Sequence, residues 1–467
     1  MPTTASALPP GPRSAIPGML SARFARDRLG FFEAMAREHG DVSWFRDMGA
    51  SFALLNHPDL VRDVLVTQQR LFHKGIGLER ARLLLGDGLL TSEGAFHLRQ
   101  RRLMQPAFHR ERIAGYGATM GRFAERHVAR WRDGVALDAS TEMAALTLAI
   151  AGKTLFDADV AGDTGVIAGA LDESLHAFGL VLLPFGEQLA RLPIPPARRF
   201  RAAKARMDAV VYRLIAERRA EVAAGARDRG DLLTMLVQAQ DAEADGAGMT
   251  DEQVRDEALT ILLAGHETTA NALAWSWWFL AQHPETERAL HAEVDAVLAS
   301  AEGAPRAATV DDLARLPYTR MVVSESMRLR PPAFVLGRRA MQPYAVPGTP
   351  WVLPQGTTVF MAQHLLHRDA RFWPDPDRFD PERWRDDATS RPKFAYFPFG
   401  AGTRVCIGEQ FAWMELTLVL ATVARRWRLA LVPGHRVVPH PVITLRAKHG
   451  IRMVAHARDG VSHPIAP

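Results

Sequence analysis

The only cysteine in the sequence, Cys406, lies in the glycine-rich segment Phe399-Gly-Ala-Gly-Thr-Arg-Val-Cys-Ile-Gly408. One cysteine in 467 residues excludes an internal disulfide framework and a cysteine-rich zinc site. A thiolate needs nearby dipoles to stay anionic, and backbone amides approach sulfur most closely where side chains are absent. The segment therefore fits either a metal-binding thiolate or an inert thiol buried in a glycine-rich turn.

A second candidate for chemistry is the segment Ala264-Gly-His-Glu-Thr268. Ala264 and Gly265 are small enough to admit a flat ligand and to let a helix open locally. The Thr268 hydroxyl, one turn after Ala264, can bond the carbonyl of that residue or a bound water. Glu267 and Thr268 together can relay protons. The alternative is a helix-packing glycine followed by a back-bonded threonine, and we expect a structural contact for His266.

A third pair, Glu325 and Arg328, puts a carboxylate and a guanidinium three residues apart on one helical face. If this pair is exposed, it contributes little to stability. If it is buried in a network, loss of one member strands a charge at a cost of roughly 3 to 5 kcal/mol.

The helix that carries Thr268 begins near Thr250, where Thr250-Asp-Glu-Gln253 reads as a capping box, and Pro284 stops the run. About 33 residues at 1.5 Å each span roughly 50 Å, so we expect this helix to cross the middle of the molecule. Apolar residues at helical spacing predict further helices over residues 31–39, 60–66, 96–108, 118–131, 143–155, 198–222 and 231–240.

After residue 340 the sequence becomes rich in proline and glycine with short β-prone runs. Residues 442–445 and 451–455 are expected to form a late hairpin. The fold class is therefore mainly α with a smaller β portion, that is, α+β.

Composition narrows the class of protein further. The chain is 48% hydrophobic and 23% charged with a net charge of +5, which is typical of a globular domain. Arginines alternate with acidic residues, and no basic block with interleaved aromatic residues predicts nucleic-acid binding. The first residues lack the apolar core of a signal peptide, and charged and polar residues interrupt the most apolar stretch, so we expect no membrane anchor.

The segment around Cys406 resembles the haem-thiolate signature of the cytochrome P450 family. Phe399, Gly402, Arg404, Cys406 and Gly408 match it position by position. Ala264-Gly-His-Glu-Thr268 resembles the oxygen-activation motif of that family, and Glu325-Ser-Met-Arg328 its ExxR element. The resemblance covers most of the chain. It implies a P450 fold with haem b between the long central helix and the Cys loop, in a single domain over residues 21–467 after a proline-rich segment, residues 1–20.

The resemblance also implies roles for individual residues. Cys406 would be the thiolate ligand of the haem iron, Phe399 would shield it, and Gly408 would let the next helix start against the ring. Ala264 and Gly265 would flank the haem, while Thr268 and Glu267 would deliver protons. Arg383 would join Glu325 and Arg328 in a scaffold network. The haem propionates would be held by His97, Arg101, Arg404 and Arg338, the last preferred to Arg339.

The implied activity is a monooxygenase reaction that inserts one atom of O2 into a C–H bond or an alkene. Electrons would come from a separate ferredoxin or flavodoxin with its reductase, in the cytoplasm. Arg99 and Arg102, with Arg110 and Arg112, are a candidate docking face for that acidic partner. The alternatives are a peroxide-driven or isomerising haem-thiolate enzyme, and a non-catalytic haem-binding module.

The segments that the resemblance places over the haem are largely apolar, which implies a lipophilic substrate. Terpenoids, polyketide-like molecules and fatty acyl chains all remain open. The segments are residues 78–90, 178–185, 261–264, 332–336 and 443–445.

Overall fold

The computed structural model describes residues 7–157, 169–170, 173, 186–226, 229–241, 246–299, 306–385 and 391–458. The chain divides into two compact units, which we describe one at a time. Unit 1 comprises Met1–Glu79, Ser324–Cys406 and Pro439–Arg446. Unit 2 comprises Arg80–Val323, Ile407–Val438 and Ala447–Pro467. The expected single domain over residues 21–467 stays a prediction.

Unit 1 is built on a five-stranded sheet in the order β1-β2-β8-β5-β3. β2 and β8 pair in parallel, and the other neighbours are antiparallel. Its strands are β1 (Val42–Asp47), β2 (Ala50–Leu55), β3 (Phe72–Lys74), β5 (Leu336–Ala340) and β8 (Thr358–Met361). The shorter strands β6 (Tyr344–Ala345) and β7 (Val352–Leu353) form a separate pair.

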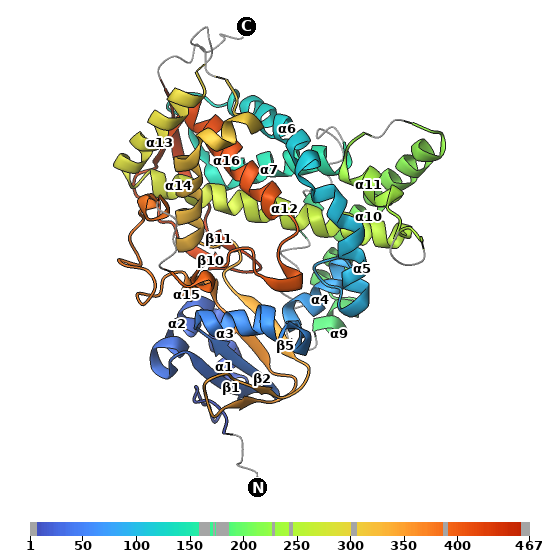
Figure 1. Cartoon of the computed structure of the whole chain (residues 1–467), viewed down its shortest axis with the longest axis vertical. Helices are drawn as coiled ribbons and strands as arrows, with labels where there is room; N and C mark the ends of the chain where they lie inside the picture. The colour runs from blue at the N-terminus through green and yellow to red at the C-terminus, as the bar shows by residue number, and fades with distance from the viewer. Residues whose placement is uncertain are drawn as a thin grey trace. The chain divides into compact units, whose positions relative to one another are not determined.

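Helices α1 (Met19–Arg26) and α2 (Arg28–His39) lie beside β1 and β2 (Figure 1). Asp27 caps α2 by accepting a hydrogen bond from the Gly30 amide. A cluster rich in phenylalanine lies between these helices and the sheet. α3 (Pro58–Arg62) leads through a π-helical turn, Asp63–Thr67, and a 3-10 turn, Gln69–Leu71, into β3, and α15 (Gln363–Leu366) follows β8. This run of turns matters because it supports the Cys406 loop.

Unit 2 is mainly helical, and its longest helix is α12 (Asp251–Leu280). Thr250 is the N-cap, and both hydrogen bonds of the predicted capping box with Gln253 are present. α12 ends at Leu280, slightly before the predicted stop, because Pro284 opens the next helix. The other helices are α4 (Ile76–Leu85), which begins in unit 1, α5 (Gly94–Met104), α6 (Arg110–Val128), α7 (Ala139–Phe156), α9 (Gly186–Arg191), α10 (Pro195–Ala223), α11 (Leu232–Gln238), α13 (Pro284–Val297) and α16 (Glu409–Arg426). α14 (Pro317–Leu329) runs from unit 2 into unit 1.

α7 and α16 pack against α12, which is buried along most of its length (Figure 1). The central helix of unit 2 therefore agrees with the prediction. A helix is present at each place predicted from apolar spacing, but α6 begins at Arg110 and not at residue 118, and the predicted helix over residues 60–66 becomes π-helical after Arg62. Among the described residues, no helix combines the length and hydropathy needed to span a membrane.

The prediction that residues 442–445 and 451–455 form a hairpin is wrong. β11 (Leu445–Ala447) pairs with β10 (Pro439–Pro441), whereas β12 (Arg452–Ala457) pairs with β4 (Ala136–Asp138) and β9 (Trp427–Leu431). One of the two partners of β12, the strand β4, thus lies more than 300 residues earlier. The alternation of apolar and polar residues within residues 442–455 can predict a strand, but it contains no information about which strand pairs with it. Predominance of helix with a smaller β portion nevertheless confirms the fold class.

Candidate active site

The Cys406 loop belongs to unit 1 and ends directly before the N-cap of α16, Gly408. Its backbone turns through Gly400 at φ 70° and Gly402 at φ 71°. A Cβ atom at Gly402 would lie 2.0 Å from the Leu65 carbonyl oxygen, so this position requires glycine for space as well as for conformation. The Cys406 amide donates to the Phe399 carbonyl at 2.9 Å, and the cysteine side chain is exposed.

The turns before β3 hold this loop in place. The amide and hydroxyl of Thr403 both donate to the Gln69 amide oxygen, at 2.8 and 2.9 Å. The Arg404 Nη1 donates to the Phe72 carbonyl at 3.0 Å. Since these contacts come from residues more than 300 positions away, the thiol is presented by tertiary contacts and not by the loop alone.

Arg338 and Arg339 are neighbours on β5 and therefore point to opposite faces of the sheet. Arg338 is buried and donates from Nη1 to the Gly337 carbonyl at 2.9 Å. Arg339 forms an ion pair with Glu79 at 2.9 Å. The two guanidiniums thus have different environments, and Arg339 already has a carboxylate partner.

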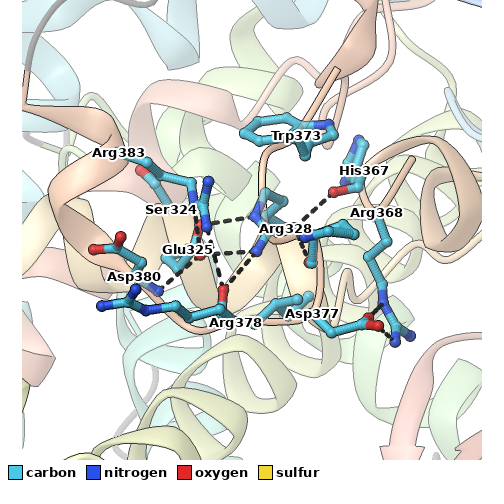
Figure 2. A network of polar contacts seen from close by, with 12 residues as sticks. Ser324, Glu325, Arg328, His367, Arg368, Trp373, Asp377, Arg378, Asp380 and Arg383 are labelled. Carbon is cyan, nitrogen blue, oxygen red and sulfur yellow. Dashed lines mark hydrogen bonds and ion pairs between the residues drawn. The ribbon is translucent and has the colours of Figure 1, made fainter. Parts of the chain in front are cut away.

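The carboxylate of Glu325 is the centre of a buried network in unit 1 (Figure 2). Arg328 donates to both Glu325 oxygens at 2.8 Å, from Nε and Nη2. Arg383 donates from Nε to Oε1 at 2.9 Å, and the Trp384 indole donates to Oε2 at 3.0 Å. The predicted network of Glu325, Arg328 and Arg383 is confirmed, while Trp384 was not predicted as a member.

The rest of the Arg328 guanidinium satisfies backbone carbonyls. Nη1 donates to His367 and Pro376 at 2.9 and 2.7 Å, and Nη2 donates to Arg378 at 3.0 Å (Figure 2). Burial, reinforced by the nearby Arg328 charge, holds the pKa of His367 well below its usual range. The network therefore fixes the chain that follows α15 and serves the scaffold.

In unit 2, α12 has one open face within its buried length. Ile261, Ala264, Gly265 and Thr268 are half-buried and follow the i, i+3, i+4, i+7 spacing of a single helical stripe. A Cβ atom at Gly265 would meet no other atom within 4 Å. The Thr268 hydroxyl donates to the Ala264 carbonyl at 2.7 Å, which confirms that predicted contact.

Glu267 lies about 100° around the helix from Thr268 and is buried, so it is not on the open stripe. The backbone carbonyl of His266 accepts a hydrogen bond from Thr147 of α7 at 3.1 Å, while the structural role expected of the His266 side chain stays a prediction. Consecutive residues of a helix cannot share a face, and the acid and the alcohol of the predicted relay therefore point in different directions.

Glu415 is an acidic residue next to this motif that sequence reasoning missed. It lies on α16, is fully buried, and contacts Thr269 of α12. Burial raises the pKa of Glu415 to about 8 against the opposing hydrogen bond with Thr269, so the carboxyl is neutral at pH 7. The sequence signal for this residue is a glutamate within an otherwise uncharged run, Trp413 to Ala424.

His97 and Arg101 share one face of α5, with His97 buried and Arg101 half-buried. The His97 Nδ1 lies 3.4 Å from the Ser92 hydroxyl. Gln100 of the same helix donates to the buried Glu257 of α12 at 3.2 Å. α5 is thus fastened to α12, and its two propionate candidates stand in unit 2, whereas Arg338 and Arg404 stand in unit 1.

Arg99 and Arg102 of the predicted docking face are engaged within the protein, and their docking role stays a prediction. Arg102 donates to both oxygens of Asp241 at 2.8 and 2.9 Å, and Arg99 forms an ion pair with the same carboxylate at 3.3 Å. Asp241 is only 1% exposed, and these contacts tie the segment before α12 to α5. The Arg110 side chain lies outside the described part of the chain. Charge alone did not show that a distant aspartate uses these arginines.

The predicted substrate segments are apolar in both units. In unit 2, Leu83, Leu90 and Ile261 are partly buried against one core cluster. In unit 1, the Leu445 amide donates to the Pro332 carbonyl at 2.9 Å, which joins two of the segments. Residues 178–185 lie outside the described residues.

The residues present fit a haem group in their chemistry. A single exposed thiol at the end of a glycine loop is a suitable soft ligand for haem iron. Guanidiniums and a histidine suit two propionates. The small-residue stripe of α12, where Gly265 would accommodate a further atom without a clash, suits a flat ring.

Comparison with known proteins agrees with a haem-binding site. The family model described as Cytochrome P450 matches residues 9–448. The chain is 40% identical over 444 residues to cyclooctatin synthase of Streptomyces melanosporofaciens, with 93% of this chain and 92% of that protein covered. It is 40% identical over 413 residues to cyclooctat-9-en-7-ol 5-monooxygenase of the same organism, with 86% and 85% covered.

A third relative is pentalenene oxygenase of Streptomyces avermitilis, 35% identical over 431 residues, with 91% of this chain and 92% of that protein covered. Among solved structures, the heme domain of cytochrome P450DA has a TM-score of 0.85 at 26% identity and covers 97% of this chain and 98% of its own. The chain therefore belongs to the cytochrome P450 family and is a haem-thiolate oxidoreductase of the monooxygenase type.

Proposed function

We propose that this protein is a terpenoid monooxygenase that binds haem b through Cys406. The observation that carries the proposal is the single thiol at the end of a loop that two left-handed glycines and Gln69 hold in place. The overall reaction is R–H + O2 + 2 e⁻ + 2 H⁺ → R–OH + H2O. Haem, when bound, supplies oxygen activation, which thiolate donation favours.

The protein's own residues bind, orient and supply protons. Cys406 is the ligand, Phe399 shields it, and Gly408 allows α16 to begin beside it. The residues proposed to hold the haem propionates are Arg404, Arg338, His97 and Arg101. The burial of Arg338 and the ion pair of Arg339 with Glu79 support the choice of Arg338.

Thr268 places a hydroxyl on the open stripe of α12. There the hydroxyl binds water or O2 and passes a proton toward the bound O2. Ala264 and Gly265 have small side chains or none, so they leave space beside that stripe of the helix. Glu267 supplies protons to the same region from the buried side of the helix. Because Glu267 and Thr268 differ in direction, we propose that at least one water links them.

The substrate class follows from two observations. The apolar residues partly buried against one core cluster of unit 2, among them Leu83, Leu90 and Ile261, suit a hydrocarbon skeleton with few polar groups. The relatives are named for cyclooctat-9-en-7-ol, an alkenol, and for pentalenene. Of the classes left open by the sequence, we propose a terpenoid hydrocarbon or alcohol.

Electrons reach the enzyme from a reduced ferredoxin or flavodoxin, in the cytoplasm. The family membership supports a separate electron donor of this kind. Product formation by the enzyme reconstituted with a ferredoxin or with a flavodoxin decides between the two donors.

The first test is spectroscopic. Reduced holoprotein treated with carbon monoxide should show the red-shifted Soret band of thiolate ligation, and Cys406→Ser should lose that band while the far-UV circular dichroism stays unchanged. A histidine-type spectrum in folded wild-type protein would contradict the proposal.

The second test concerns the substrate. Titration with a panel of cyclic terpenoids and free fatty acids should give spin-state shifts with the terpenoids at lower concentration. Product formation should require NAD(P)H with a surrogate ferredoxin and reductase. Conversion driven equally well by hydrogen peroxide alone would favour the peroxide-driven alternative.

A further inference from the structure

Unit 1 exposes three apolar side chains at the end of its β1–β2 hairpin. Ile16 and Met48 are each 59% exposed and Met19 is 40% exposed, and we call these residues the N-terminal apolar patch. Single exposed apolar side chains are common on protein surfaces. These three differ because structural contacts bring them together.

The contacts that gather the patch are formed by Asp47, at the end of β1. Its carboxylate oxygens accept from the amides of Gly18 and Ser21, each at 2.7 Å, and so bind the first turn of α1 to the hairpin. A Cβ atom at Gly18 would lie 3.3 Å from the Met48 sulfur. The Met19 amide donates to the Ile16 carbonyl at 3.3 Å. Ile16, Met19 and Met48 therefore surround Gly18.

Met48 occupies a position that folding does not favour for methionine. The hairpin turns through Met48 at φ 48° and Gly49 at φ 81°, between the paired residues Asp47 and Ala50. Two-residue turns of this kind prefer asparagine or aspartate at the first position, because a bulky side chain is strained there. A strained apolar residue that points into solvent indicates a role outside the fold.

The surface beside the patch is basic. Residues 7–26 include Arg13, Arg23 and Arg26 but no acidic residue, and all three arginines are exposed. None of the three has an ion-pair partner within the described part of the chain. The Asp47 carboxylate is buried and engaged by backbone amides, so it does not offset their charge at the surface.

α1 presents these groups on one face. Met19, Arg23 and Arg26 follow i, i+4, i+7 spacing, while Leu20 is buried and Phe24 packs against Phe31, Phe32 and Phe360. Figure 1 shows α1 beside β1 and β2. The aromatic contacts hold the helix on unit 1 and keep its basic and apolar face outward.

We propose that the N-terminal apolar patch and its three arginines bind the surface of an anionic lipid bilayer. Apolar side chains enter the boundary between headgroups and acyl chains, and arginines attract anionic headgroups. Three apolar side chains are too few for a stable protein dimer, which buries about 800 Å² on each partner. Peripheral attachment of this kind is separate from a membrane anchor.

This proposal deepens the proposed function, because lipophilic substrates concentrate in bilayers. Its test, however, does not depend on turnover. Holoprotein should bind vesicles of phosphatidylglycerol and phosphatidylcholine in a flotation assay, more weakly as salt increases, and bind pure phosphatidylcholine vesicles far less.

Met48→Asn should lower the partition coefficient roughly tenfold, and Arg23→Gln and Arg26→Gln should each lower it roughly fivefold. Val135→Ser, which removes another exposed apolar side chain, is the matched control and should bind like wild type. The carbon monoxide spectrum of Met48→Asn should equal that of wild type, which separates this proposal from the haem proposal.

Three results would overturn the proposal: no binding by wild type, equal binding to both vesicle types, or unchanged binding by the Met48 and arginine variants. Sedimentation velocity tests whether the patch instead binds a second copy of this chain. A wild-type dimer that Met48→Asn converts to monomer would assign the patch to a second copy of this chain instead.

Discussion

At the scale of single residues, three of the four hydroxyl side chains of the helix α12 form similar hydrogen bonds in different surroundings. Thr268, Thr269 and Ser276 each donate to a carbonyl one turn earlier. Thr268 is on the open stripe, Thr269 contacts Glu415, and Ser276 is buried. Position around the helix, and not the hydrogen bond, therefore distinguishes the catalytic candidate.

Substitution of Thr268 by alanine tests that distinction. Without the hydroxyl on the open stripe, proton delivery slows, and product formed per NAD(P)H consumed should fall by at least roughly tenfold while hydrogen peroxide rises. Ser276→Ala removes the same kind of bond from the same helix and should leave coupling unchanged. Equal coupling in Thr268→Ala and wild type would exclude the relay.

Glu415 predicts a pH dependence of stability. Its pKa rises from 4.5 to about 8 in the folded protein because of burial, so the unfolded state releases a proton that the folded state retains. Stability is therefore lost as pH rises from about 4.5 to about 8, by up to about 3 kcal/mol at pH 7. The stability of Glu415→Gln relative to wild type should increase over this range.

Chemical unfolding at pH 5, 6, 7 and 8 measures this difference. A gap between Glu415→Gln and wild type that stays constant with pH would show that the Glu415 carboxyl does not retain its proton on folding.

At the scale of elements, the Cys406 loop depends on a turn that comes early in the chain. Gly402 lies against the Leu65 carbonyl, and Thr403 is held by Gln69 of the next turn. The π-helical and 3-10 turns between α3 and β3 thus shape the loop from outside. A loop sequence that matches a signature still needs this support to present its thiol.

Gly402→Ala should abolish stable haem loading. The left-handed conformation alone costs about 1–2 kcal/mol for alanine, and the contact with a backbone carbonyl adds to it because neither side can move away. Gly348→Ala is the matched control, since Gly348 has φ 73° but open space around it. The measurement is the haem-to-protein ratio after purification, and equal ratios for the two variants would exclude the steric argument.

At the scale of the whole molecule, the Glu325 network joins segments about 50 residues apart within unit 1. Its charges are buried, so each depends on the others for compensation. Ion pairs at the surface contribute less to stability, because solvent screens their charges. The stability of the molecule should therefore respond very differently to the loss of a buried and of an exposed glutamate.

Glu325→Gln should cost roughly 3 to 5 kcal/mol of unfolding free energy, because Arg328 and Arg383 lose their carboxylate. Glu382→Gln, which breaks the exposed pair with Arg385, should cost less than about 1 kcal/mol. Denaturant titration compares them. Similar losses in both variants would mean that the buried network has no special role in stability.

The sequence by itself determined the features that local residue order controls. The capping box at Thr250, the helices with apolar spacing, the loop glycines and the pairing of Glu325 with Arg328 are each contained within a few turns of chain. Family membership follows from the same motifs. These agree with the structure because short-range hydrogen bonding and helical periodicity need no distant partner.

Only the tertiary structure decided which distant residues meet. β12 pairs with β4 and β9, Asp241 engages Arg99 and Arg102, Arg339 bonds Glu79, and Glu415 is buried against Thr269. Each outcome depends on contacts across tens or hundreds of residues. Burial and pairing are properties of the packed chain, so the same arginine or glutamate is a surface charge in one fold and a structural contact in another.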